Sequence, residues 1–185
     1  TICKLTIKSY MKKGLSQALL TVFFMLFITS VFSQERDSLN TSTKSETVTP
    51  KSEAGNLDMI TAPETFEVSS QFNGFISKSH GSAIVVTLIN DVAFPLIAKG
   101  MNKDFYAKNN LSFISESDVQ TVHGYKGKSF KLSFNLEDND YIRYMVYIGD
   151  IKNTLWLNIT CPKIVEPVLE PEILKCIDSV NLNPN

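Results

Sequence analysis

The sequence has few of the residues from which metal sites and many catalytic sites are built. Its 185 residues include two histidines, His80 and His123, and three cysteines. Each histidine stands beside a glycine in a segment typical of a turn, with no cysteine, second histidine or carboxylate at ligand spacing. We therefore expect both histidines on surface turns, and we expect neither a metal site nor a cofactor.

Sequence motifs for phosphate binding and for a nucleophilic serine are also missing. The chain has neither Gly-x-x-x-x-Gly-Lys nor Gly-x-Gly-x-x-Gly, and no Gly-x-Ser-x-Gly segment. A catalytic triad can still assemble from residues that are distant in sequence. An enzyme such as a hydrolase with an unrecognised site is therefore the alternative to a protein without enzymatic activity.

The chain lacks a long uninterrupted apolar run. Its most apolar stretch, residues 15–32, is 18 residues long and contains serine, glutamine and threonine, whereas a spanning helix needs about 20 mostly apolar residues. The basic residues Lys12 and Lys13 precede this stretch, directly after the first methionine, Met11. A basic segment followed by a short apolar one is typical of a secretory signal peptide, and an uncleaved membrane anchor is the alternative. We expect translation to start at Met11.

Small residues at the end of the apolar stretch predict cleavage between Ser33 and Gln34. Residues 1–33 are then a leader and signal peptide, and the protein is exported to the periplasm or the exterior without a stable membrane span. Removing them takes away four lysines and no acidic residue, leaving 14 Lys and Arg against 19 Asp and Glu, a net charge of −5. This acidic balance argues against nucleic-acid binding, which depends on basic patches.

Residues 34–56 are rich in Ser, Thr, Lys and Glu and have only two bulky apolar residues, Leu39 and Val48. Such a segment cannot bury enough surface to offset its chain entropy, so we expect a disordered linker. The remaining residues, 57–182, have the length and apolar content of one domain.

The apolar pattern of this domain changes from period two to helical spacing and back. Alternation predicts strands at 65–68, 74–77, 83–89, 112–119, 130–136, 141–148 and 154–161. Turns are expected at 79–82, 122–128, 138–140 and 149–153. Residues 94–108 are expected to form two short helices, the second capped by Asn102, or one bent helix. A last helix is expected to begin at Pro171.

Short turns between strands indicate antiparallel neighbours. The predicted fold class is α+β, an antiparallel β-sheet with helices packed on it. The strand 141–148 is apolar on both of its faces apart from Arg143, which predicts that both faces are covered.

Several turn and core segments of residues 58–182 resemble the PsbP-like and DcrB-like envelope proteins. They are Phe72-Asn73-Gly74-Phe75, Phe94-Pro95 with Gly100-Met101, Val122-His123-Gly124-Tyr125-Lys126-Gly127, the strand 141–148 with Gly149-Asp150, and Pro162 before the last helix. The resemblance implies a PsbP-like sandwich and a non-enzymatic accessory or binding protein of the envelope. It supplies no catalytic motif.

Arg143 is the most informative single residue of the domain. A charge inside an apolar strand is costly unless it is paired. The sequence leaves three explanations open: Arg143 lies at a sheet edge, pairs with a carboxylate, or faces a pocket. Among the other candidates, Asn158-Ile159-Thr160 matches the N-glycan sequon, but it lies in a predicted strand and is therefore a chance match.

The exported chain would keep two cysteines, Cys161 and Cys176. Cys161 is in phase with the buried face of its strand, and Cys176 lies on the apolar stripe of the last helix with Ile173 and Val180. Export permits a disulfide, whereas a domain of this size does not need one. A bond and two buried thiols both remain open, and we favour the thiols.

These observations favour an exported, non-enzymatic binding module of the cell envelope whose partner is a protein or a small ligand. A pocket around Arg143 would indicate a ligand, and a broad apolar patch would indicate a protein partner.

Overall fold

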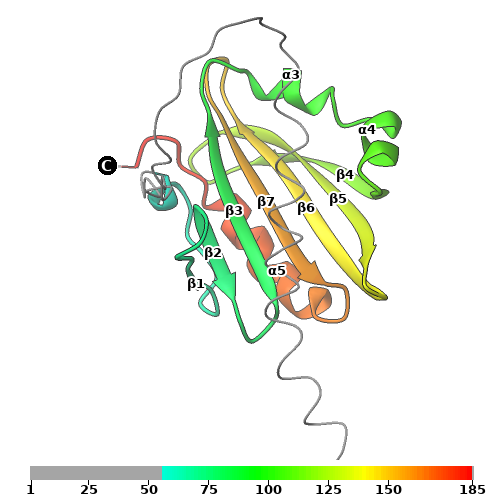
Figure 1. Cartoon of the computed structure of the whole chain (residues 1–185). Coiled ribbons are helices and arrows are strands. Elements are labelled where there is room, and N and C mark those ends of the chain that lie inside the picture. Colours follow the sequence, from blue (N-terminus) through cyan, green and yellow to red (C-terminus); the bar gives the residue numbers. More distant parts are fainter. Residues whose placement is uncertain (1–55, 185) are drawn as a thin grey trace, which may run out of the picture. The chain divides into compact units, whose positions relative to one another are not determined.

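The computed structural model describes residues 56–184, and the leader, the cleavage site at Ser33 and Gln34, and almost all of the predicted linker lie outside them. The described residues build one antiparallel sheet with helices on both of its faces (Figure 1). The elements follow in the order η1 (Leu57–Met59), β1 (Glu67–Val68), β2 (Gly74–Ser77), β3 (Ser82–Ile89), α3 (Phe94–Ala98), α4 (Lys103–Lys108), β4 (Ser112–Gln120), β5 (Lys126–Leu136), β6 (Asn139–Gly149), β7 (Thr154–Pro162) and α5 (Glu166–Asp178).

The seven strands lie in the order β1-β2-β3-β7-β6-β5-β4, and every pair is antiparallel. The predicted α+β class with an antiparallel sheet is confirmed. The topology brings β7, the last strand in sequence, between β3 and β6. The central strands are therefore β7 and β6, and the sheet edges are the short β1 and the exposed β4.

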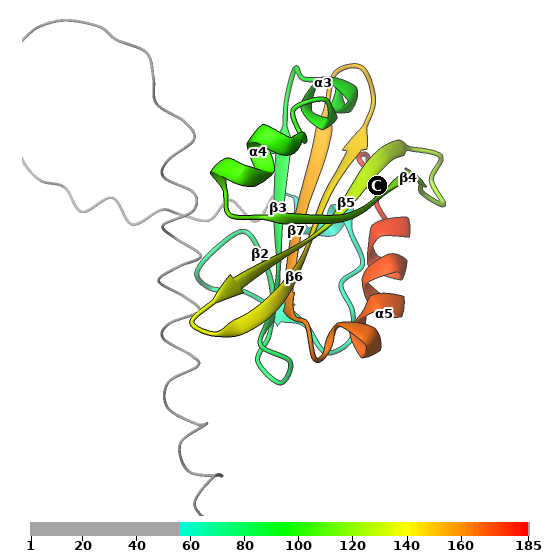
Figure 2. The same ribbon diagram turned by 90° about the vertical axis from the view of Figure 1, so that its right-hand side faces the viewer.

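The two faces of the sheet carry different helices. Figure 2 shows α5 on one side and α3 with α4 on the other. Ile173, Cys176, Ile177 and Val180 of the α5 region pack on Leu155, Leu157, Ile159 and the even-numbered apolar residues of β6. On the opposite face, Met101 and Tyr106 of the α3–α4 segment pack on Phe130, Leu132, Met145 and Tyr147. Strand β6 is thus covered on both faces, as its sequence predicts.

Local sequence explains most of the turns. Gly81 has φ +60° in the β2–β3 turn, a conformation that favours glycine. Asn102 caps α4 by accepting a hydrogen bond from the Phe105 N–H at 3.0 Å, as predicted. Glu137 and Asp138 form the two-residue β5–β6 turn with φ of 49° and 63°, so that the turn begins one residue earlier than expected.

Two predicted boundaries are wrong. The segment 126–128 belongs to β5 rather than to a turn. Gly127 is needed there because a Cβ would lie 2.3 Å from the Tyr147 carbonyl oxygen of β6. Helix α5 begins at Glu166 with Pro167 in its first turn, so that Pro171 lies inside the helix instead of starting it.

None of the helices in residues 56–184 is long and apolar enough to cross a membrane.

Candidate functional site

Arg143 lies in the middle of the sheet, on the face that carries α3 and α4. It belongs to β6, and its cross-strand partners are Leu132 of β5 and Thr160 of β7. Residues that are paired across antiparallel strands project from the same face, so all three point to this side. The side chain is 9% exposed. A position at a sheet edge, the first of the three explanations, is therefore wrong.

The contacts of the guanidinium are to neighbouring strands. Its Nε donates a hydrogen bond to Thr160 Oγ1 at 3.3 Å. Its Cζ lies 4.5 Å from the centroid of the Phe134 ring, in a cation–π arrangement, and Phe134 stacks on Tyr141 at 5.3 Å. Among residues 56–184, Arg143 forms no ion pair with a carboxylate. Pairing within the described chain, the second explanation, is also wrong.

Burial lowers the pKa of Arg143 from 12.5 to about 10, because removal from water penalises the cation. The residue still carries its charge at neutral pH. A buried cation with one hydrogen bond and one ring contact has most of its five N–H donors available to an anion.

Asn158 is a second buried polar residue on this face, and one of its atoms has no hydrogen-bond partner. Asn158 of β7 pairs with Met145 of β6 and Val85 of β3, so it projects to the same side as Arg143. It is 6% exposed, and its Oδ1 has no hydrogen-bond donor within the described residues. Leaving a buried acceptor unpaired costs about 1–3 kcal/mol, and a donor from a bound water or from a ligand would remove that cost. The sequon asparagine is thus buried within β7, the strand in which the sequence predicts it.

We call this region the Arg143 face and define it by eight residues. They are Ala83, Val85, Phe134, Tyr141, Arg143, Met145, Asn158 and Thr160. The apolar cluster under α3 and α4 ends beside it, since Leu132 and Met145 belong to that cluster. On this face, no helix of residues 56–184 lies over the half of the sheet towards the β5–β6 turn, whereas α5 lies on the opposite face (Figures 1 and 2).

The polar cluster on the opposite face is fully paired. Lys131 Nζ lies 2.6 Å from Glu166 Oε1 and 2.8 Å from Glu170 Oε1, and the Tyr144 hydroxyl is within hydrogen-bond distance of both carboxylates. Burial lowers the pKa of Lys131, but its bonds to the two glutamates prevail and leave the pKa raised. Because each charge is matched, this cluster holds the start of α5 on the sheet and has no group free for a ligand.

The two histidines occupy the turns predicted for them. His123 is exposed in the β4–β5 turn, and His80 is half-buried in the β2–β3 turn. His80 Nδ1 lies 3.0 Å from Ser77 Oγ, which is the nearest approach to a nucleophile–base pair in residues 56–184. Ser77 is 0% exposed, so its hydroxyl cannot meet a substrate without movement of the turn.

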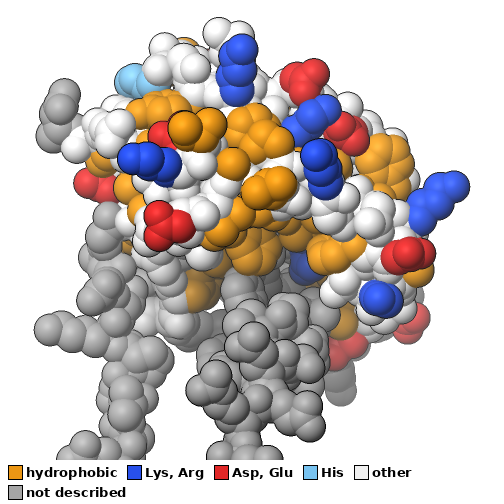
Figure 3. Space-filling model, turned by 90° about the horizontal axis from the view of Figure 1, so that it is seen from above, with side chains coloured by type: hydrophobic (Ala, Val, Ile, Leu, Met, Phe, Trp, Pro, Cys, Tyr) orange, Lys and Arg blue, Asp and Glu red, His pale blue; other side chains and the backbone are white. Residues whose placement is uncertain are grey.

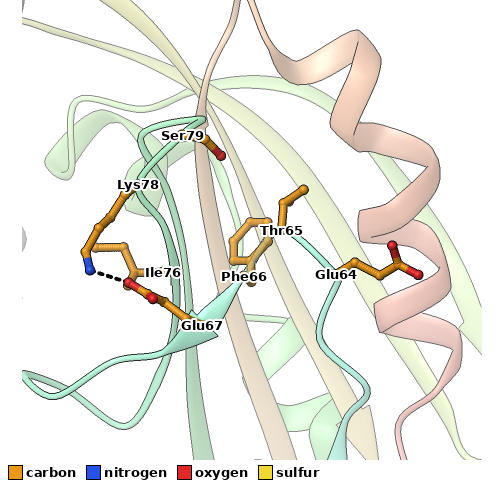
Figure 4. Close-up of a pocket in the computed structure, with 7 residues that line it drawn as sticks. All are labelled: Glu64, Thr65, Phe66, Glu67, Ile76, Lys78 and Ser79. Carbon is orange, nitrogen blue, oxygen red and sulfur yellow. Dashed lines mark ion pairs between the residues drawn. The ribbon is translucent and has the colours of Figure 1, made fainter.

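A shallow cavity of about 300 Å³ lies beside this turn, at the lower end of ligand-pocket volumes. It is lined by Glu64, Thr65, Phe66, Glu67, Ile76, Lys78 and Ser79. Figure 4 shows the Glu67–Lys78 ion pair crossing it, with Glu64 directed away from Lys78. The charged side chains of this cavity are exposed: Lys78 and Glu67 are paired with each other, and Glu64 lies apart from them. These side chains therefore do not converge on a point where they could orient a ligand.

Apolar side chains are also exposed at the end of the sheet where α3 lies. Figure 3 shows them grouped between scattered charges. Leu96 of α3 is 65% exposed and Ile151 of the β6–β7 turn is 86% exposed. Single exposed apolar side chains are common on protein surfaces, so this end identifies no partner by itself.

Cys161 and Cys176 are both free and buried between the sheet and α5. Burial raises the pKa of each thiol to about 12. Whether they form a bond in the exported, oxidised protein stays a prediction.

Sequence reasoning identified Arg143 and missed Asn158. Asn158 carries little signal in the sequence, because it stands in the non-apolar phase of an alternating strand with Thr154 and Thr160, where an exposed polar residue is expected. The strand pairing that brings β7 beside β6 was needed to place the two groups on one face.

No family model and no curated protein matches the chain. Several solved structures are similar to the chain at low identity. PA94 of Pseudomonas aeruginosa, a protein of unknown function, has a TM-score of 0.46 and 16% identity over 56% of this chain and 74% of its own. LpqN of Mycobacterium tuberculosis, described as involved in cell envelope biogenesis, has a TM-score of 0.50 and 15% identity over 64% of this chain and 78% of its own. Neither is described as PsbP-like or DcrB-like.

Proposed function

We propose that the chain is an exported, non-enzymatic binding module of the cell envelope, and that the Arg143 face is its binding site. The observation that carries the proposal is the buried guanidinium of Arg143 without a carboxylate partner in the described chain. A protein tolerates such a charge at a cost, and functional sites are where such costs are found.

Other observations support the envelope location. The signal-like segment before Gln34 predicts export. LpqN, which shares the fold, is described as involved in cell envelope biogenesis. The resemblance of the turn and core motifs to PsbP-like and DcrB-like proteins points in the same direction.

The proposal can be tested by complementation in a strain that lacks the gene, with sensitivity to detergent as the measure of envelope integrity. We expect the wild-type protein to restore resistance and Arg143→Met, exported at the same level, to fail. Lys128→Met is the matched control, because Lys128 lies on the same sheet face but is paired with Glu116 and Asp118. Full restoration by Arg143→Met, or an unaltered envelope in the deletion strain, would contradict the proposal.

A hydrolase is the second candidate, and the contact between His80 and Ser77 is the observation that favours it. The complete burial of Ser77 and the missing acidic partner for His80 among the described residues favour a structural role for this pair. We expect His80→Ala and His123→Ala to complement the deletion as the wild type does. Loss of function in either variant with the fold intact would support an enzyme instead.

A further inference from the structure

The two edges of the sheet differ in how much unpaired backbone they present. The edge strand β1 has only two residues, whereas β4, the strand beyond β5 in Figure 1, has nine, and eight of these nine are exposed. Within residues 56–184, β4 pairs with β5 alone, so its outer side presents backbone N–H and C=O groups without a strand partner. Strand β4 therefore has the length and the free groups to pair with a further strand.

Most of β4 also lacks the features by which proteins keep an edge strand from pairing, such as lysine, proline or a bulge along its length. The strand contains neither lysine nor proline. Its register with β5 shifts once, between Phe113 and Ser115, and is regular from Ser115 to Gln120. We call residues 115–120 the β4 edge. These six residues are as many as a typical strand contains, so they offer one complete strand as a template.

The side chains of the β4 edge carry two carboxylates on one face. Glu116 is opposite Phe130, and Asp118 is opposite Lys128, so both acids project to the face that carries α3 and α4. Lys128 Nζ lies 2.6 Å from Glu116 Oε1 and 3.1 Å from Asp118 Oδ1, so that one cation is shared between two carboxylates. The side chains of Glu116 and Asp118 are 42% and 85% exposed. Since a carboxylate accepts about four hydrogen bonds, both acids can bind a second cation from the outer side.

These two acids make a second copy of the chain a poor partner for the β4 edge. In antiparallel self-pairing the side chains that face each other lie on the same side of the sheet, so the two-fold axis passes beside a residue. Two registers use five of the six residues, one centred on Ser117 and one on Asp118. The first places Glu116 opposite Asp118, and the second places Asp118 opposite itself. Like charges directly opposite each other destabilise a sheet, so the β4 edge favours a strand with basic side chains at these positions.

We propose that the β4 edge binds an extended, basic segment of a partner protein, which adds to the sheet as a further strand beside β4. Lysine or arginine side chains at two alternate positions of this segment lie opposite Glu116 and Asp118. The side chains between them are small or β-branched and lie beside Ser115, Ser117 and Val119 on the α5 face. Main-chain hydrogen bonds provide the affinity, and the alternate side chains provide the specificity. This surface is separate from the Arg143 face and does not depend on the function proposed for it.

The test is an NMR titration of the ¹⁵N-labelled exported protein with short peptides. The basic peptide is Thr-Val-Lys-Thr-Lys-Val-Thr, which reads the same in both directions and so offers its lysines in either strand orientation. We expect it to shift the amide signals of residues 115–120 and to bind about 2- to 20-fold more weakly to Glu116→Gln/Asp118→Asn, the range for two exposed ion pairs. The matched control, Glu64→Gln/Glu67→Gln, removes two charges at the opposite edge and should leave binding unchanged. The peptide with glutamate in place of both lysines should bind more weakly than the basic one.

Methylation of the peptide backbone separates strand addition from simple attraction of charges. In an antiparallel pair only every second residue of a strand directs its N–H to a given neighbour. We therefore expect N-methylation of one set, either the two lysines or the valines with the central threonine, to abolish binding, and N-methylation of the other set to preserve it. Equal effects of the two sets, equal binding of the acidic peptide, or no shift at residues 115–120 would overturn the proposal. Concentration-dependent shifts of the same signals without peptide would also overturn it, because a second copy would then occupy the β4 edge.

Discussion

The buried charge of Arg143 lowers the stability of the fold, and it lies at a position that suits the binding of an anion. Its charge is buried on a central strand, and the described chain offers it one hydroxyl and one ring. Replacement of buried charges by apolar groups of similar size often stabilises proteins. A residue that lowers stability and is placed among apolar side chains is best explained by what it binds.

This reasoning predicts that Arg143→Met raises the free energy of unfolding by about 1–3 kcal/mol. The lowered pKa of about 10 means that the folded state disfavours the charged form, so the penalty is fully present below pH 10 and is relieved between pH 10 and 12.5. Urea unfolding of both proteins at pH 7 measures the gain. A loss of stability instead would show that Arg143 is a structural residue.

Lys131 is the opposite case, a charge with every partner in place. Lys131→Met leaves Glu166, which is buried, without its cation, and we expect a loss of about 2–3 kcal/mol. The bond from Lys131 also lowers the pKa of Glu170, so this contribution is present above pH 4.5 and is lost as the pH falls through the lowered value.

Lys78→Met is the control for this prediction, because the Lys78–Glu67 pair is exposed and should change stability by less than about 0.5 kcal/mol. Unfolding by urea at pH 7 and at pH 3 separates the two variants. Equal stability of Lys131→Met and Lys78→Met at pH 7 would refute the anchoring role of the cluster.

At the scale of elements, the sequence predicts which segments are strands and helices better than where they begin. The strict alternation of Phe130, Leu132 and Phe134 identifies β5, but its start at Lys126 is hidden by Gly127. Glycine usually marks a turn, and only the close approach of the Tyr147 carbonyl shows why a strand needs it here. The candidate site could also be predicted only in part. Arg143 is conspicuous within a single strand, whereas its proximity to Asn158 depends on the long-range pairing of β6 with β7.

Helix α5 shows that proline alone does not determine where a helix begins. Pro167 and Pro171 both fit a first turn, and the structure uses Pro167. Pro171 then lacks the N–H that would bond to the Pro167 carbonyl one turn earlier. The helix keeps this defect because Ile173, Cys176 and Ile177 hold it on the sheet.

Pro171→Ala should therefore restore one helical hydrogen bond and raise the free energy of unfolding by about 1 kcal/mol, less than the full cost of an interior proline because the unfolded chain also becomes more flexible. Pro171 is exposed, so no packing is lost. Pro167→Ala, where no N–H is needed, is the control and should change stability little or reduce it. Thermal unfolding of the two variants tests whether Pro171 destabilises the helix. A clearly lower stability of Pro171→Ala than of the wild type would contradict this prediction.

At the scale of the whole domain, the two faces of the sheet differ in how completely their polar groups are paired. The α5 face is closed, with a continuous apolar core and a fully paired polar cluster. The opposite face is covered by α3 and α4 on one half. Its other half carries Arg143, which has no carboxylate partner among residues 56–184, and the unpaired Oδ1 of Asn158. Both faces of the sheet therefore contribute a buried core, and the unpaired polar groups lie on the face that we propose for binding.

The reactivity of Cys161 and Cys176 can show whether α5 stays packed on its face of the sheet. Cys161 lies on β7 and Cys176 on α5, both in the core between them, so a reagent can reach them only when α5 leaves the sheet. Their pKa values, raised to about 12 by burial, also keep both thiols protonated in the folded state at pH 8. The same shift makes stability decline above pH 9, as the thiols of the unfolded chain begin to ionise.

We therefore expect the exported protein to show no reaction with Ellman's reagent at pH 8 over minutes and to release two equivalents in denaturant without reductant. Arg143→Met should slow the residual reaction of the native protein, and Lys131→Met should speed it, because the thiols react from the opened state in proportion to its population. Absence of thiols in denaturant would show instead that a disulfide joins β7 to α5, and rapid reaction of the native protein would show that α5 opens independently of the sheet.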